Sequence, residues 1–174
     1  YVYGYGYQCT DENYGLYNYY QGAATSATVK YSHFKGYKGH YAYGLYNYGN
    51  GAELHAHYVH GYGEESVWSG GGATDGNSYG LMNTSKAAAW LYGGYYRGYK
   101  GYDCFGIANN NVGGSTIEAH NVKAYGKYCD DDNYGLYNNY GKVTVHGGAF
   151  YGYAQNRSNS AGQQCIGVYV TGYN

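Results

Sequence analysis

The chain has 174 residues, with 32 Gly, 31 Tyr and no Pro, and only 12% of its residues are charged. Its formal net charge of -1 excludes a basic nucleic-acid-binding face, because neutralising phosphates needs a surplus of Lys and Arg. No apolar run approaches the roughly 18–20 residues of a membrane-spanning helix, so the chain is not expected to span a membrane. The length fits one domain.

A five-residue motif, Tyr-Gly-Leu-Tyr-Asn or a variant of it, recurs along the whole chain. Its copies span residues 14–18, 43–47, 79–83, 105–109, 134–138 and 166–170. Tyr, Leu and Ile favour strands, whereas frequent Gly disfavours helices. A period near 29 residues therefore predicts a β-solenoid of about six coils, with three short strands per coil.

A second motif follows each of the first five copies. It begins with an aliphatic residue, and four variable residues later comes Val, Phe or Tyr. After one more variable residue, it ends with Gly or Ala followed by Tyr. The copies begin at Val29, Leu54, Leu91, Ile117 and Val145. Within the first motif, strand alternation predicts that Tyr14, Leu16 and Asn18 face the interior, while Gly15 and Tyr17 face outward.

The repeat style resembles that of right-handed parallel β-helix proteins, the architecture of pectate lyases and many microbial surface adhesins. The resemblance covers the whole chain and implies three parallel sheets with stacked ladders inside. The aliphatic ladder would comprise Leu16, Leu45, Leu81, Ile107, Leu136 and Val168. An interior amide ladder would comprise Asn18, Asn47, Asn83, Asn109 and Asn138, each amide bonding to the coils above and below.

The two ends of the chain predict end-to-end assembly. Residues 1–9 align with residues 121–129, and both lead through an acidic stretch into the first motif. The chain thus starts and stops within a coil, without a cap, which would leave strand edges exposed. We expect a head-to-tail contact that does not close and therefore builds a homopolymer. A fragment of a longer β-helix is the alternative.

The four cysteines occupy repeated positions. Cys104 and Cys165 precede the fourth and sixth copies of the first motif by one residue, whereas Cys9 and Cys129 precede the first and fifth by five. Neighbouring coils lie within disulfide reach. We therefore predict a Cys104–Cys129 bond within a subunit and a Cys165–Cys9 bond between subunits, unless the thiols are free and buried. A zinc site is disfavoured, because no two cysteines are close in sequence.

One difficulty is that the coil across this junction would have 22 residues, whereas the shortest internal coil has 26.

No catalytic residue, metal ligand set or cofactor motif is predicted, and the chain is not expected to be an enzyme. His55 and His57 share a strand face, but the register secures no third ligand. The acidic run 130–132 lacks the spacing of a calcium loop. A pectate-lyase-like site would need an Asp cluster with a nearby Arg, and neither Arg97 nor Arg157 is in register with stacked acids.

Two N-glycosylation sequons begin at Asn83 and Asn156. Asn83 belongs to the expected interior ladder, so Asn156 is the better candidate. Disulfides indicate an oxidising setting, and we expect an extracellular or cell-surface protein whose signal peptide has been removed. The predicted function is a structural subunit of an extracellular filament, serving adhesion or a matrix, with surface glycans as a further partner. The alternative is a monomeric carbohydrate-binding or carbohydrate-processing β-helix domain.

Overall fold

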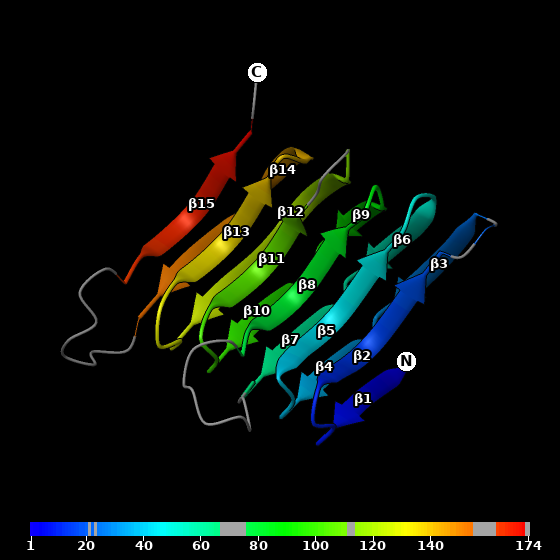
Figure 1. Ribbon diagram of the computed structural model, residues 1–174. Helices are drawn as coiled ribbons and strands as arrows, with labels where there is room; N and C mark the ends of the chain where they lie inside the picture. Colours follow the sequence, from blue (N-terminus) through cyan, green and yellow to red (C-terminus); the bar gives the residue numbers. More distant parts are fainter. Residues whose placement is uncertain (21, 23, 67–75, 111–113, 155–162, 173–174) are drawn as a thin grey trace.

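The computed structural model describes residues 1–20, 22, 24–66, 76–110, 114–154 and 163–172. These residues form fifteen β-strands and no helix, and every strand pairing is parallel. The strands stack as a β-solenoid of about five turns, one fewer than predicted (Figure 1). The predicted all-β parallel fold is thus confirmed. Within the described part of the chain, no helix could cross a membrane.

The first face of the solenoid is a six-stranded sheet that carries the first motif in register. Its order is β15-β13-β11-β8-β5-β2. The bounds are β2 Glu12–Tyr19, β5 Tyr41–Tyr48, β8 Ser78–Thr84, β11 Cys104–Asn110, β13 Asn133–Asn139 and β15 Cys165–Thr171. We call this sheet face 1.

The other sheet contains two columns of strands. Face 2 comprises β3 (Thr25–Lys30), β6 (Ala52–His57), β9 (Ala88–Tyr92) and the first halves of β12 (Thr116–Lys127) and β14 (Lys142–Tyr153). Face 3 comprises β1 (Tyr3–Tyr7), β4 (His33–Tyr37), β7 (His60–Glu64), β10 (Tyr95–Tyr99) and the second halves of β12 and β14. Each turn therefore has three strand places, as expected, although β12 and β14 each fill two of them.

Left-handed residues form the corners between faces 2 and 3. Tyr31, Tyr58 and Asn121 have positive φ values of 49°, 54° and 52°, and Gly93 and Gly147 take the same place in the other turns. A residue with positive φ lets the chain turn the corner from face 2 to face 3. This conformation is costly for a residue with a side chain, so the surrounding structure has to stabilise it.

The second motif is out of register in two of its five copies. The structure pairs Val29 with Ala56, not with Leu54, and Leu91 with Ala119, not with Ile117. A shift of two residues leaves the apolar face unchanged, because side chains alternate with a period of two. Pattern matching alone could not detect this shift.

Two facing rows of glycines let faces 1 and 3 pack backbone against backbone. In face 1, a β-carbon on Gly44 would overlap the backbone nitrogen of Tyr62 in β7. In face 3, a β-carbon on Gly63 would overlap backbone atoms of Ala42 and Tyr79. The same is true of the equivalent glycines in the neighbouring turns, which explains why the repeat requires Gly at these positions.

The expected strict alternation of the first motif is wrong at its glycine. Tyr14 and Tyr17 stack with ring centroids 4.7 Å apart, and Tyr43 and Tyr46 are equally close. Rings three residues apart can meet only if they lie on the same face, so the Tyr14-type position is not interior. These rings form a second apolar cluster, separate from the one that contains the leucines.

The aliphatic column lies in the main core, but its two ends are not buried. Leu45, Leu81 and Ile107 are completely buried, and Leu136 is 2% exposed. Leu16, in the first turn, is partly buried, and Val168, in the last strand, is 51% exposed. The prediction of a fully buried column is therefore wrong for Val168, because no further turn covers it in the single chain.

Candidate functional site

The two ends of the solenoid present matching strand edges. At one end β2, β3 and β1 each pair with a single strand, and at the other end β15 and β14 do so. The free side of an edge strand offers unpaired N–H and C=O groups to a further strand. Figure 1 shows these edges at opposite ends of the stack, so the two surfaces face in opposite directions.

Exposed apolar side chains concentrate at these ends. Val168 and Val170 in β15 are 51% and 66% exposed, and Tyr17 in β2 is 48% exposed. The central residue equivalent to Tyr17, Met82, is 9% exposed. The end turns thus expose side chains that the central turns cover.

The five ladder asparagines form one continuous chain of hydrogen bonds. The Nδ2 of each of the first four donates to the Oδ1 of the next residue in the column at 2.8–2.9 Å. The column comprises Asn18, Asn47, Asn83, Asn109 and Asn138. All of these residues are buried, and Val170 follows at the next place. Asn83 is completely buried, whereas Asn156 lies outside the described residues.

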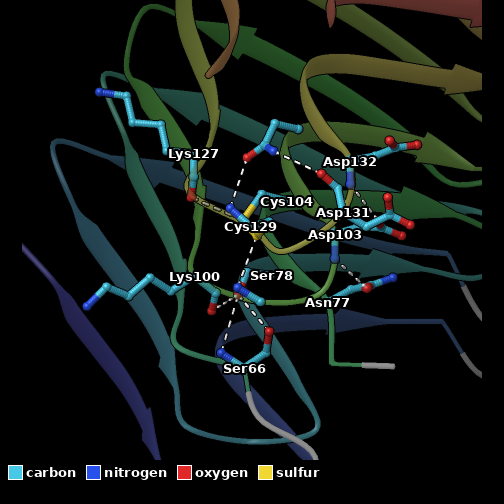
Figure 2. The surroundings of a disulfide bond; sticks show 12 residues. Ser66, Asn77, Ser78, Lys100, Asp103, Cys104, Lys127, Cys129, Asp131 and Asp132 are labelled. Atoms are coloured by element: carbon cyan, nitrogen blue, oxygen red, sulfur yellow. Dashed lines mark hydrogen bonds between the residues drawn. A yellow bond between two sulfur atoms is a disulfide. The ribbon is translucent and has the colours of Figure 1, made fainter. Parts of the chain in front are cut away.

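The Cys104–Cys129 disulfide is present, as predicted. It joins successive turns with a Cα–Cα distance of 5.6 Å (Figure 2). Both cysteines are buried, and the Gly101 N–H lies 3.0 Å from Cys129 Sγ. The bond therefore staples the turn of β11 to the turn of β13.

Cys9 and Cys165 are free and exposed at opposite ends of the solenoid. Cys165 begins β15, which pairs in parallel with β13. Cys9 lies in a turn built like that of Cys129: the Cys9 N–H donates to Asn13 Oδ1 at 3.2 Å, and the Cys129 N–H donates to Asn133 Oδ1 at 3.1 Å. Each free cysteine thus occupies the structural place of one half of the internal disulfide.

An ion cluster on the outside of face 3 joins three turns. Glu64 contacts Lys35 and Arg97, and the Arg97 guanidinium carbon lies 5.2 Å from the centroid of the Tyr62 ring. Arg97 is in register with Tyr62 rather than with an acid, yet it reaches Glu64 diagonally. A single carboxylate held between two cations is not the acid cluster of a pectate-lyase-like site.

A groove follows the corner between faces 2 and 3. It has a volume of about 590 Å³, and its lining includes Tyr58, Tyr92, Tyr95, His60 and His120. A second hollow of about 400 Å³ continues along face 3 and shares Tyr95 and His60 with the groove. Burial lowers the pKa of His60, with a smaller contribution from His33, so the groove favours the neutral imidazole.

The histidines considered from the sequence lie on the outside of face 2. His55 stacks on Trp90 at 4.5 Å, and His57 stacks on Tyr92 at 4.7 Å. In the part of the chain that the structure describes, they do not meet a third metal ligand. The acidic run also differs from a calcium loop, since Asp132 accepts hydrogen bonds from Tyr134 Oη at 2.6 Å and from the Gln164 N–H at 2.9 Å.

Sequence reasoning missed a cluster of Glu118, His120 and His146, whose potential ligand atoms all lie within 4.8 Å of one another. The two histidines are in register on β12 and β14. The shifted alignment of the second motif had separated them, whereas correct register would have revealed the pair.

Comparisons with protein-family models, with curated proteins and with solved structures gave no match.

Proposed function

We propose that the chain is a structural subunit that stacks end to end with further copies into a secreted, extracellular filament, serving adhesion or a matrix. The observation that carries this proposal is the match between the two ends. Edge strands with the same repeat pattern, exposed apolar residues and one free cysteine occur at both.

Stacking would continue the internal register from copy to copy. In face 1, β15 would pair with β2 of the next copy, which would cover Val168 with Leu16. In face 3, β14 would pair with β1 of the next copy. Both contacts are β-augmentation, in which backbone hydrogen bonds provide affinity and side-chain columns fix the register.

The junction would differ from an internal turn in one respect. Among the described strands, β15 would lie in face 1 and β1 in face 3, and none would lie in face 2 between β14 and β3 of the next copy. The face-2 strands of the internal turns have five or six residues, which is more than the four-residue difference between 22 and 26.

A disulfide between Cys165 and Cys9 of the next copy would then repeat the internal bond. The equivalence of their positions supports this pairing, and neighbouring strands lie about 4.8 Å apart. Disulfides persist in oxidising compartments, which is the basis for proposing an extracellular location.

Electron microscopy and non-reducing gel electrophoresis of the oxidised protein test the proposal. We expect fibres one solenoid wide with an axial repeat of about 29 Å, because each copy contributes six strands to face 1 at about 4.8 Å each. The gel should show multimers that collapse on reduction. Cys9→Ser should remove them while leaving the internal disulfide.

A matched pair of variants separates stacking from folding. Val168→Asp places a charge in the junction, so fibres should disappear while circular dichroism of the monomer stays unchanged. Thr144→Asp, on the outer face of β14, should leave fibres intact. Wild-type protein that stays monomeric at high concentration under oxidising conditions would contradict the proposal.

The groove favours a second candidate function, carbohydrate binding. Aromatic rings from successive turns line it, and hydroxyl and imidazole groups lie beside them. Rings of this kind provide apolar platforms, with polar edges that can hydrogen-bond to sugar hydroxyls. Screening against a panel of glycans tests this candidate, with Tyr95→Ala expected to abolish binding and Tyr19→Ala, in β2 on face 1, expected to preserve it.

A further inference from the structure

We infer that Glu118, His120 and His146 form a surface binding site for a divalent transition metal of borderline softness, with Zn²⁺ as the reference ion. The site lies on the outside of face 2 and does not depend on the proposed stacking. It combines one carboxylate and two imidazoles, a donor set that suits zinc.

The fold brings the three side chains to one place by register. Glu118 and His120 are two residues apart on β12, so they project from the same side of the strand. His146 pairs directly with His120 on the neighbouring strand β14. No loop has to close to complete the set, because all three residues belong to paired strands.

The ligand atoms are close to the separations that a tetrahedral ion needs. His120 Nε2 lies 2.7 Å from Glu118 Oε1, and His146 Nε2 lies 3.7 Å from the same oxygen. Zinc–nitrogen and zinc–oxygen bonds of about 2.0–2.1 Å place neighbouring ligand atoms about 3.4 Å apart. The side chains are 32–51% exposed, so small rotations can open the carboxylate–imidazole contact and admit an ion.

Ring stacking holds the two imidazoles in place. The His120 and His146 rings are 4.3 Å apart with an interplanar angle of 12°, and Tyr92 stacks on the other side of His120 at 5.0 Å. The stack keeps both rings side by side on the outer face, and the exposed rings would turn out of this parallel arrangement so that both nitrogen lone pairs converge on one ion.

The proposed metal site has an open coordination position and lies next to the groove between faces 2 and 3. Three protein ligands leave a fourth position of a tetrahedral ion open to water or to an oxygen of a ligand. His120 also lines the groove between faces 2 and 3, beside Tyr92 and Lys123. A bound ion therefore lies at the rim of this groove.

The chain contains a natural control on the same face. His55 Nε2 lies 3.8 Å from Glu53 Oε2, and the His55 ring stacks on Trp90. Among the described residues, this imidazole–carboxylate pair has no third ligand. A site that needs three donors should not bind zinc tightly there. Of the described residues, only Glu118, His120 and His146 bring three such donors together.

Isothermal titration calorimetry with ZnCl₂ at pH 7.5 tests the inference. The titration uses a Cys9→Ser, Cys165→Ser background, because exposed thiols are themselves zinc ligands. We expect saturable binding of about one equivalent. Adding Glu118→Gln, His120→Gln or His146→Gln should weaken it at least tenfold, whereas His55→Gln should leave it unchanged.

Circular dichroism of each variant keeps the result interpretable, since these side chains project from the outer face and their loss should not unfold the solenoid. Absence of saturable binding to the background protein would overturn the inference. Equal affinity in the His120→Gln and His146→Gln variants would also overturn it.

Discussion

The central turns and the end turns carry the same motifs but bury them to different extents. Leu81 in a central turn is completely buried, whereas the equivalent Val168 in the last strand is 51% exposed. The difference does not arise from hydrophobicity, since both side chains are aliphatic. Burial in this solenoid is provided by the turns above and below, so each turn is stabilised mainly by its neighbours.

The motif glycines provide the largest expected difference between the centre and the end. A β-carbon on Gly80 would overlap the backbone nitrogen of Arg97 and the backbone carbonyl oxygen of Gly106. Backbone atoms fixed in two sheets cannot move aside, so Gly80→Ala should lower the free energy of unfolding by about 3 kcal/mol or more. Denaturant unfolding followed by circular dichroism measures this change.

Gly167→Ala is the matched control at the same motif position in β15. The added carbon would lie 2.8 Å from the Phe150 carbonyl oxygen, and its next neighbour is 3.7 Å away. Since β15 is an edge strand, it can shift, and we expect a loss of about 1 kcal/mol. Equal losses in the two variants would mean that the end turn is packed as rigidly as the centre.

Substitutions in the column of ladder asparagines should also cost more stability at the centre of the solenoid than at its end, although the difference should be smaller than for the glycines. The Asn83 Nδ2 group has three acceptors, Ala87 O at 3.1 Å, Asn109 Oδ1 at 2.9 Å and Thr116 O at 3.1 Å. Asn83→Ala removes these three bonds and also the acceptor of Asn47 Nδ2, while Ala87 O keeps the bond from the Thr116 N–H. The substitution should cost about 2–3 kcal/mol.

Asn138 is the comparison, because its Nδ2 donates to Gly141 O at 2.8 Å and no asparagine follows it in β15. Asn138→Ala should cost about 1 kcal/mol. Thermal unfolding of both variants in the same buffer provides the test, and a larger loss for Asn138→Ala would contradict the interpretation.

The sequence was sufficient to predict the fold because the first motif is long and distinctive. Its spacing placed Leu45 opposite Leu81 and Cys104 one turn from Cys129, and both relations hold. The second motif was less informative, because aliphatic residues at every second position give the same pattern after a shift of two residues. The paired positions of His120 and His146 were missed for that reason.

The break in alternation at the motif glycine could not be predicted either. It depends on how closely face 3 approaches face 1, which is a property of the folded solenoid and not of one strand. For the same reason, the sequence alone did not show that Tyr14 and Tyr17 would share a face. The exposure of Val168 likewise depends on what covers the last strand.

The half-buried carboxyl of Asp103 provides the last and smallest comparison between a central turn and an end turn. Asp103 precedes β11 and is covered by the next turn, whose Asp132 N–H donates to its Oδ1 at 3.1 Å. Burial raises the pKa of Asp103 to about 6, the hydrogen bond from Asp132 opposes this, and the charges of Asp132 and Asp131 add to it.

Because the pKa is higher in the folded state than the ordinary value of 3.8, the folded protein binds more protons than the unfolded chain between about pH 4 and pH 6. The contribution of Asp103 to stability is therefore complete below pH 4 and is lost as the pH rises to 6. Asp103→Asn keeps the acceptor for Asp132 and removes this loss. The variant should match the wild type near pH 4 and exceed it by about 1 kcal/mol at pH 7, a value reduced because the carboxyl is partly exposed.

Asp11→Asn is the end-turn control, since the Asp11 side chain is 81% exposed, and it should change the free energy of unfolding by less than about 0.5 kcal/mol at either pH. Unfolding in urea at both pH values measures the difference for each variant. A gain at pH 7 that is equally large at pH 4 would show that the effect of Asp103→Asn does not arise from ionisation. If both Asp103→Asn and Asp11→Asn raised the free energy of unfolding at pH 7, burial of the carboxyl by the next turn would not be the cause of the stabilisation.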